Sequence, residues 1–342
     1  MTFPRSVEPR ISLLCVGVLC LMTGCGSHEE VPQPVAVLQG NSNHLFKVTF
    51  SRDGNWLIGT YGNGPIVIWD ARTYEHLGTL LGHKAGVIAL AISNDGKLLA
   101  SGDGFGEVAV WDLTARREKA RWTACEGHAP RVTSVAFHPE GASLFTAGTD
   151  GLVRRWDLKS LQAEVVYKNQ NLFDQPVICA LSPNGETLAI AKGGKARNVL
   201  LLSMKDRQEV MHLDLGHGSH RILFAPDGSQ LVIIMNGRAC LMSLDGQYRW
   251  VANTREMLTS YAYSPCGKYV AASGAEHVRS DAVVYIWDAA TGQELCRFVS
   301  HPGASASGLA FSHDSRLLAT GSRDGSVRLW ELDSLLKLKS KE

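Results

Sequence analysis

The chain has 342 residues, with 34 Lys and Arg against 33 Asp and Glu, and a formal net charge of +1. A hydrophobic content of 45% with 20% charged residues is ordinary for a folded globular core. Because no long run of Lys or Arg is present, the composition argues against a protein that binds nucleic acid through a clustered basic patch.

The first 24 residues are interpreted as a secretory signal peptide. Arg5 and Arg10 lie in a short polar start, and an apolar run of twelve residues, ISLLCVGVLCLM, follows at 11–22. A charged start, a short apolar segment and small residues at the cut are typical of a signal. The run is too short for a comfortable membrane span. A buried helix or a single anchor helix is the alternative interpretation.

Residues 22–25, MTGC, resemble the cleavage motif of bacterial lipoproteins, with Met22 in place of the more usual Leu. The resemblance implies that Cys25 becomes the first mature residue and carries acyl chains that anchor it to a membrane. Residues 26–27 lack the aspartate that often retains such lipoproteins at the inner membrane. We therefore expect an outer-membrane lipoprotein facing the periplasm, with a polar, proline-bearing tether over 25–34.

From residue 35 to residue 339 the sequence is dominated by one repeated landmark. An apolar residue, then Ser or Ala or a His-Pro pair, leads into a turn, usually with Gly, seven times: FSRDG from Phe50, ISNDG from Ile92, FHPEG from Phe137, LSPNG from Leu181, FAPDG from Phe224, YSPCG from Tyr263 and FSHDS from Phe311. The steps between landmarks run from 39 to 48 residues. That spacing is close to the period of a four-stranded propeller blade, and each turn between alternating apolar runs is a hairpin signal.

A tryptophan follows the landmark by nineteen residues in the first, second, third and seventh copies. These are Trp69, Trp111, Trp156 and Trp330. With Gly-His pairs at 82–83, 127–128 and 216–217, the copies resemble the WD40-repeat family over roughly 40–331. The fourth and fifth copies lack the Trp, and the sixth carries an insertion at 274–282.

The resemblance implies an all-β, seven-bladed β-propeller made of four-stranded antiparallel blades. A short blade cannot bury both faces alone, so radial stacking and a closed ring are favoured. VAVLQG at 35–40 is expected to close the ring as the outer strand of the last blade, and LLKLKSKE at 335–342 could compete for that edge.

In the WD40 family a His, a Ser or Thr, an Asp and a Trp form a hydrogen-bonded structural chain within one blade. Carried over by position, the resemblance assigns this role to His83, to His128, Thr146, Asp150 and Trp156, and to His301, Thr320, Asp324 and Trp330. The alternative is a catalytic pair of His128 and Asp150, but a buried polar group must be satisfied, and a structural network meets that need.

The sequence predicts no catalytic residue, metal site or cofactor. MHLDLGHGSH at 211–220 holds His212, Asp214, His217 and His220, which are metal-ligand types. However, His217 belongs to a Gly-His pair, and His212 and Asp214 alternate along one predicted strand. Complete phosphate-loop, G-x-S-x-G and H-E-x-x-H motifs are absent.

The family resemblance places residues just before the structural Asp, and just before the first inner strand, on a binding face. By position these are Arg131, Thr149 and Arg323. We expect a monomeric, non-catalytic scaffold at the cell envelope that binds another protein or peptide. Four alternatives stay open: an envelope enzyme, a small-ligand binder that uses the central channel, a structural component of an outer-membrane assembly machine, and a cytoplasmic WD40 scaffold with a misread signal.

Five cysteines remain beyond the signal and the anchor. They are Cys125, Cys179, Cys240, Cys266 and Cys296. Their scattered spacing does not match a disulfide framework or a zinc site. Most are expected to be apolar strand residues, with Cys266 exposed in a turn. Whether any of them pair is left open.

Overall fold

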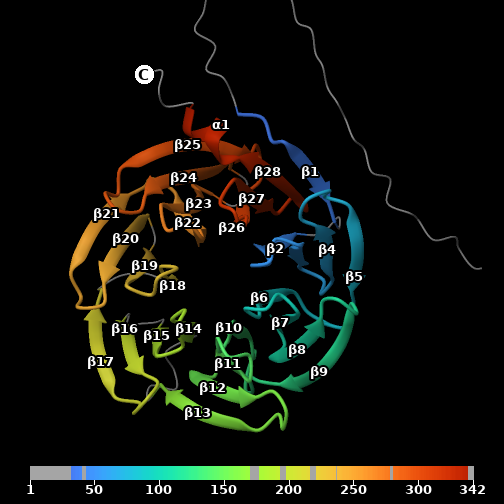
Figure 1. The fold of residues 1–342 in the computed structure, drawn as a ribbon, viewed down its shortest axis with the longest axis vertical. Helices are drawn as coiled ribbons and strands as arrows, with labels where there is room; N and C mark the ends of the chain where they lie inside the picture. The colour runs from blue at the N-terminus through green and yellow to red at the C-terminus, as the bar shows by residue number, and fades with distance from the viewer. Residues whose placement is uncertain are drawn as a thin grey trace, which may run out of the picture. The chain divides into compact units, whose positions relative to one another are not determined.

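Residues 32–40, 44–169, 177–192, 198–215, 221–235, 237–277 and 280–337 are described by the computed structural model. They form seven four-stranded antiparallel sheets. Figure 1 shows these sheets as blades arranged around a central opening. This confirms the all-β, seven-bladed propeller predicted from the repeat.

The first four blades follow one another along the chain. Blade 1 contains β2 Leu45–Phe50, β3 Trp56–Tyr61, β4 Ile66–Asp70 and β5 His76–Leu80. Blade 2 contains β6 Val87–Ile92, β7 Leu98–Asp103, β8 Glu107–Asp112 and β9 Arg117–Thr123. Blade 3 contains β10 Val132–Phe137, β11 Ser143–Gly148, β12 Leu152–Asp157 and β13 Ala163–Lys168. Blade 4 contains β14 Val177–Leu181, β15 Thr187–Lys192, β16 Asn198–Ser203 and β17 Glu209–Asp214.

The last three blades complete the ring. Blade 5 contains β18 Arg221–Phe224, β19 Gln230–Met235, β20 Arg238–Ser243 and β21 Tyr248–Asn253. Blade 6 contains β22 Met257–Tyr263, β23 Tyr269–Ala275, β24 Ala282–Asp288 and β25 Glu294–His301. Blade 7 contains β26 Ala306–Phe311, β27 Leu317–Ser322, β28 Ser326–Glu331 and, from the start of the chain, β1 Ala36–Gln39.

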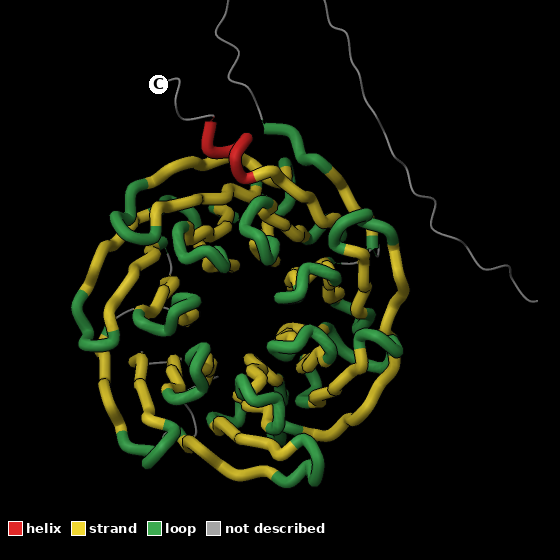
Figure 2. Tube along the Cα trace, viewed as in Figure 1, coloured by secondary structure: helices red, strands yellow, loops and turns green. Residues whose placement is uncertain are grey.

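Ring closure follows the prediction made for residues 35–40. Strand β1 pairs antiparallel with β28, so that Ala36 lies opposite Leu329 and Leu38 opposite Val327. The competing C-terminal segment does not take this edge in its described part, because Leu332–Lys337 forms the short helix α1. Leu332 and Leu335 of this helix are buried in the apolar cluster between blades 6 and 7. Figure 2 shows the helix in red at the outer rim of the ring.

The repeated landmark is the turn that joins the first and second strands of a blade. In blade 2 the Ser93 hydroxyl donates to Asp95 over 2.6 Å and accepts the Leu98 N–H over 2.9 Å. The glycine that follows, Gly96, has a φ of +70°, which glycine adopts without steric cost. Blade 7 has Ser315 in the glycine position, with a φ of +59°. Where the landmark contains Ser followed two residues later by Asp or Asn, it therefore encodes a side-chain-supported tight turn.

The two residues of the Trp-Asp dipeptide have different roles, since the tryptophan lies in the core and the aspartate supports a turn. Trp69 is buried, whereas the carboxylate of Asp70 accepts the N–H groups of Arg72 and Thr73, each over 2.8 Å. Asp288 caps the equivalent turn of blade 6 in the same way. These bonds lower the pKa of Asp70, since the Thr73 and Arg72 amides favour the charged carboxylate.

The hydrophobic core is divided among the blade interfaces. Seven clusters of buried apolar side chains lie between adjacent blades, one at each of the seven interfaces. The cluster that joins blade 7 to blade 1 brings Val327 and Leu329 against Leu45 and Trp69. Each blade thus buries both faces only because it has a neighbour on each side.

Candidate functional site

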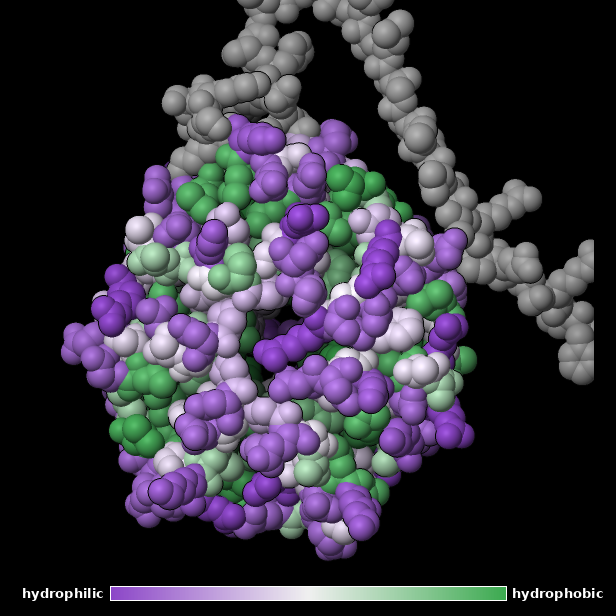
Figure 3. Space-filling model, viewed as in Figure 1, coloured by the Kyte–Doolittle hydropathy of each residue, from purple (hydrophilic) through white to green (hydrophobic). Residues whose placement is uncertain are grey.

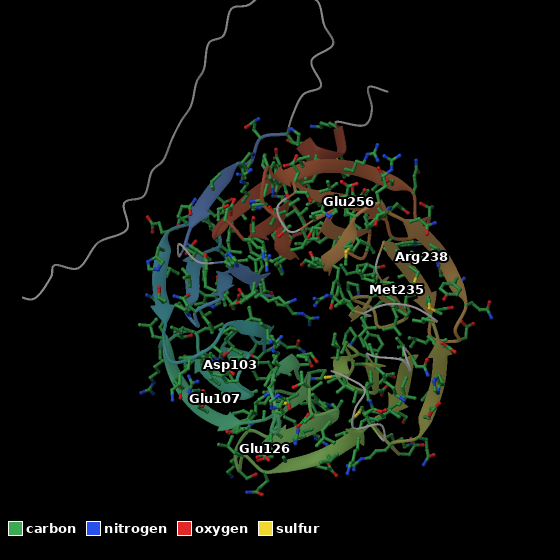
Figure 4. The ribbon with its side chains drawn as sticks, turned by 180° about the vertical axis from the view of Figure 1, so that it is seen from behind. Asp103, Glu107, Glu126, Met235, Arg238 and Glu256 are labelled. Carbon is green, nitrogen blue, oxygen red and sulfur yellow. The ribbon has the colours of Figure 1, made fainter. Side chains whose placement is uncertain are left out.

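The antiparallel order of the strands defines one face of the ring. The loop from the outer strand of one blade to the inner strand of the next, and the turn between the second and third strands, lie on the same side. We call this side the crossover face. The six residues labelled in Figure 4 all belong to it or flank its turns.

Blade 2 carries a complete hydrogen-bonded chain beneath the crossover face. His83 Nδ1 lies 3.0 Å from Asp103 Oδ2, and His83 Nε2 lies 2.7 Å from Ser101 Oγ. Trp111 Nε1 donates to the same Ser101 hydroxyl over 2.7 Å. All four residues are buried, so the chain fixes the loop before β6 to the second and third strands.

Blade 7 brings together the four residues that the sequence assigned to it. His301 Nε2 lies 2.9 Å from Thr320 Oγ1, and His301 Nδ1 lies 3.3 Å from Asp324 Oδ2. Trp330 Nε1 donates to the Thr320 hydroxyl over 2.9 Å. Burial by itself would raise the pKa of Asp324, but hydrogen bonds from His301 and Ser326 outweigh it and hold that pKa well below its usual range.

Blade 3 does not form the expected chain. Trp156 Nε1 donates to Thr146 Oγ1 over 2.9 Å, but His128 is exposed on its loop. The partner of Asp150 is instead Arg154, whose Nη1 lies 2.6 Å from Asp150 Oδ2 and 3.0 Å from the Ala124 carbonyl oxygen. The assignment of His128 to the chain was therefore wrong. The Arg154 guanidinium, on strand β12 of the same blade, binds the Asp150 carboxylate instead.

Blades 4, 5 and 6 replace the chain with apolar or aromatic packing. The residues that occupy the register positions of Ser101 and Trp111 are Ile190 and Leu202 in blade 4, and Ile233 and Met242 in blade 5. All four are buried. In blade 6, Trp287 stacks on Tyr285 with ring centroids 5.4 Å apart. The missing tryptophans of the fourth and fifth copies thus correspond to blades held by apolar contacts.

Ser101 and Asp103 were not identified from the sequence. Ser101 precedes Trp111 by ten residues, as Thr146 precedes Trp156 and Thr320 precedes Trp330, so the spacing could have found it. The aspartate could not be found in this way. Asp150 and Asp324 lie six residues before their tryptophans, whereas Asp103 lies eight residues before Trp111. In blade 2 the residue six before the tryptophan is Phe105.

His83, Asp103 and Glu107 are the group of metal-ligand types that comes together among the described residues, with ligand atoms within 4.8 Å of one another. Asp103 and Glu107 lie close together in Figure 4. Arg121 enters the group, since its Nη1 lies 3.1 Å from Glu107 Oε2 and 3.4 Å from His83 Nδ1. A fixed positive charge at this point favours a structural ion-pair network over a cation site.

The residues of the 211–220 segment are only partly described. His212 lies on β17, with Nδ1 3.4 Å from Glu209 Oε1. His217 and His220 lie outside the described residues.

The predicted contact residues lie on the crossover face in two different blades. Arg131 is exposed, and its N–H donates to Thr149 Oγ1 over 2.9 Å. The Thr149 hydroxyl in turn donates to the Ala129 carbonyl over 3.2 Å, so its hydrogen bonds stabilise the loop that precedes β10. Arg323, half-buried in blade 7, donates its N–H to the Ser305 carbonyl over 3.1 Å. The structure thus brings Arg131 and Thr149 together and leaves Arg323 in another blade.

Two exposed apolar residues on the crossover face were missed. Phe105 is 61% exposed in the turn between β7 and β8, and Leu81 is 69% exposed in the loop after β5. Leu81 lies two residues before His83, and Phe105 lies two residues after Asp103. The 3.0 Å contact between His83 and Asp103 therefore ties together the backbones that carry these side chains.

The five cysteines left open by the sequence are free thiols. Cys125, Cys179, Cys240 and Cys296 are buried and Cys266 is exposed, as expected for a turn. Burial raises the pKa of the Cys179 thiol to about 11. Cys25 and the segment 1–31 lie outside the described residues. Within the described residues, no helix has the length and hydrophobicity needed to cross a bilayer.

Comparison with known proteins points to one family. Residues 74–112, 120–157 and 292–331 match WD40, described as WD domain, G-beta repeat. A WD repeat-containing protein 26 homolog from Arabidopsis thaliana is 23% identical over 341 residues, which cover 93% of this chain and 54% of that protein. Human Transducin beta-like protein 2 is 27% identical over 242 residues, covering 63% of this chain and 52% of that protein. The chain thus spans about half the length of these two relatives.

Two further matches cover more of the compared protein. Human Serine-threonine kinase receptor-associated protein is 26% identical over 289 residues, covering 81% of this chain and 76% of that protein. The β-propeller domain of Cps50 (Swd1) from Myceliophteria thermophila superposes with a TM-score of 0.77 at 18% identity, covering 88% of this chain and 99% of that domain. The three matched segments and the WD repeat-containing relative agree with the predicted resemblance to the WD40-repeat family, and the solved structure shares the propeller fold.

Proposed function

We propose that this protein is a non-catalytic scaffold that binds another protein or peptide on the crossover face of blades 2 and 3. WD40 propellers generally serve as protein-interaction scaffolds, and that general role is the starting point. The observation that carries the proposal is the exposure of Phe105 and Leu81 on loops held by a buried hydrogen-bonded chain.

The position of Phe105 supports a binding role. In blades 3 and 7 the residue six before the tryptophan is an aspartate, which pairs with Arg154 in blade 3 and with His301 in blade 7. In blade 2, Asp103 supplies the carboxylate that contacts the histidine. The residue six before Trp111 does not have this role, and it is the exposed Phe105. Burying a side chain such as Phe against a partner contributes about 1.5–3 kcal/mol. Aromatic residues are also enriched among the residues that dominate interface energies.

The surroundings of Phe105 supply a polar rim. Lys84 and Glu126 are exposed on the two neighbouring crossover loops, and Arg131 lies beside Thr149 at the start of blade 3. Interfaces commonly combine an apolar centre with a polar rim of this kind. We also propose three residues as contacts with the partner: Arg131 and Thr149 in blade 3, and Arg323 in blade 7.

Cross-linked affinity capture from native membranes tests the binding face. The full chain, Phe105→Asp and Arg131→Ala should be compared with Tyr248→Asp, which changes an aromatic residue that is 52% exposed on the outer strand β21. A stoichiometric partner retained by the Tyr248 variant and lost by the Phe105 variant is expected. Equal capture by Phe105→Asp and the unchanged chain would reject this face.

We also propose that lipidated Cys25 holds the propeller at the cell envelope, in the outer membrane and facing the periplasm. The support is the sequence of residues 11–25. The relatives described above come from eukaryotes and lend this setting no support. Membrane fractionation of Cys25→Ser tests it: the variant should move to the soluble fraction, and unchanged membrane association would reject lipid anchoring.

A further inference from the structure

The strands that line the central channel contain positively charged residues and no negatively charged ones. Seven innermost strands line the opening, and all seven are described. Two of them contain a positively charged residue, Lys47 in β2 and Arg221 in β18. The sequences of β6, β10, β14, β22 and β26 contain no charged residue. These seven strands therefore contribute two positive charges and no carboxylate.

Lys47 and Arg221 occupy the same level of the channel. Each lies three residues before the phenylalanine that ends its strand, Phe50 in β2 and Phe224 in β18, and these phenylalanines hold equivalent register positions opposite Leu57 and Leu231. Strands β2 and β18 lie on opposite sides of the central opening (Figure 1). The two cations therefore approach from opposite walls at one depth.

The other inner strands place no charged residue at this level. The residues that hold the same register position are small in four of the five remaining inner strands: Ala89, Ser134, Ser260 and Gly308. Figure 3 shows a hollow at the centre of the ring, with strongly hydrophilic side chains projecting into it.

Within the described residues, the Lys47 and Arg221 side chains form no hydrogen bond or ion pair with a protein group. Burial, and to a smaller extent the neighbouring Arg221 guanidinium, lowers the pKa of Lys47 to about 7. Two like charges held in a confined space repel each other. An anion bound between them would be attracted to both, and this attraction would outweigh the repulsion.

We propose that the central channel binds a small phosphate-bearing anion between the Lys47 ammonium and the Arg221 guanidinium. A phosphate group carries a charge of about −1.5 to −2 near neutral pH, which matches two cations better than a single carboxylate does. The guanidinium presents a fork of N–H donors to the phosphate oxygens, and the lysine adds a compact positive charge.

Calorimetric titration of the purified full chain with inorganic phosphate at pH 7 and low ionic strength tests the site. Lys47→Met and Arg221→Met should each weaken binding by at least about tenfold, because each removes one charged contact. Lys119→Met is the matched control, since Lys119 is exposed on the outer strand β9 and should leave the affinity unchanged. Lys47→Arg keeps the charge and should retain binding. Thermal unfolding of each variant checks that the propeller is intact.

The proposal is overturned if the unchanged chain does not bind phosphate, or if Lys47→Met and Arg221→Met bind it as well as the Lys119 variant does. A parallel titration with a tetra-glutamate peptide distinguishes the source of the anion. Binding of the peptide without binding of phosphate would assign the channel to an acidic protein segment and would also overturn the proposal.

Discussion

Arg154 and Asp150 are joined by an ion pair, with Nη1 and Oδ2 2.6 Å apart, in a blade whose histidine points to solvent. Both side chains are largely buried, with 16% and 11% of their surface exposed. In blades 2 and 7 a buried imidazole contacts the carboxylate instead, that of Asp103 in blade 2 and that of Asp324 in blade 7. One fold position thus accepts either an imidazole from the preceding loop or a guanidinium from the third strand.

This relationship predicts unequal effects of two substitutions in blade 3. Arg154→Met should lower the free energy of unfolding by about 1–3 kcal/mol, because Asp150 keeps its charge and loses its partner. His128→Ala should change it by less than about 0.5 kcal/mol, since the ring is exposed. Urea unfolding followed by tryptophan fluorescence measures both. A larger loss for His128→Ala would contradict the structural assignment.

The shared hydroxyl of blade 2 predicts a difference between two blades. Ser101→Ala removes a partner from both His83 and Trp111, and should cost about 2–4 kcal/mol. Thr146→Val in blade 3 removes a partner from Trp156 alone and should cost about half as much. Guanidinium unfolding of the two variants gives the comparison. Equal losses would mean that the His83 contact adds nothing to stability.

The low pKa of Asp324 predicts an acid-dependent contribution to stability. Its folded pKa lies well below the unfolded value of about 3.9, so the charged carboxylate stabilises the folded state above that pH. The contribution is lost as the pH falls through the folded value. Asp324→Asn should therefore be less stable than the unchanged chain at pH 6, and the difference should shrink below about pH 4.

Urea unfolding between pH 6 and pH 2.5 measures this difference. Glu75→Gln, at an exposed turn, is the control and should track the unchanged chain. A difference between Asp324→Asn and the unchanged chain that stays constant with pH would contradict the prediction.

The alternation of side chains along β1 predicts the effect of changing the strand that closes the ring. Leu38 packs against the cluster between blades 7 and 1, whereas Val37 is 48% exposed. Leu38→Asp should lower the free energy of unfolding by about 1–3 kcal/mol, because a charge would replace an apolar contact. Val37→Asp should change it by less than about 0.5 kcal/mol. Chemical unfolding checks both, and equal effects would mean that β1 lies in another register.

The repeated turn explains why the architecture could be predicted. Ser93, Asp95 and Gly96 satisfy a tight turn by local hydrogen bonds and a positive φ, and copies with other residues at these positions keep the same backbone turn. Closure by residues 35–40 was predictable for a similar reason, since that segment resembles the strand before each Gly-His pair. Both features depend on local sequence, and local sequence is what a repeat preserves.

The site depends on contacts between strands, and these were harder to predict. His128 has the same spacing to Thr146 as His83 has to Ser101, yet Arg154 takes its place at the carboxylate. The residue opposite Ser101 in the register is Ala109, and the residue opposite Thr146 is Arg154. In blade 7 the residue opposite Thr320 is Arg328, yet His301 contacts Asp324, so the cross-strand residue alone does not decide which group meets the carboxylate.

Helix α1 was not predicted either. The alternating LLKLK segment favoured a strand, but the outer edge of blade 7 is occupied by β1. Leu332 and Leu335, which are three residues apart, both become buried when the segment is helical.

The pairing of Ala36 with Leu329 has a consequence for synthesis on the ribosome. Blades 1 to 6 can each pair their strands soon after they emerge, because all four are consecutive in the chain. The last blade cannot, since its outermost strand is made first and its other three strands are made last. The nascent chain therefore passes through an open arc whose two terminal faces, including Leu45 and Trp69, are exposed until the final blade arrives. A chaperone that covers these faces would act on the chain before the ring exists.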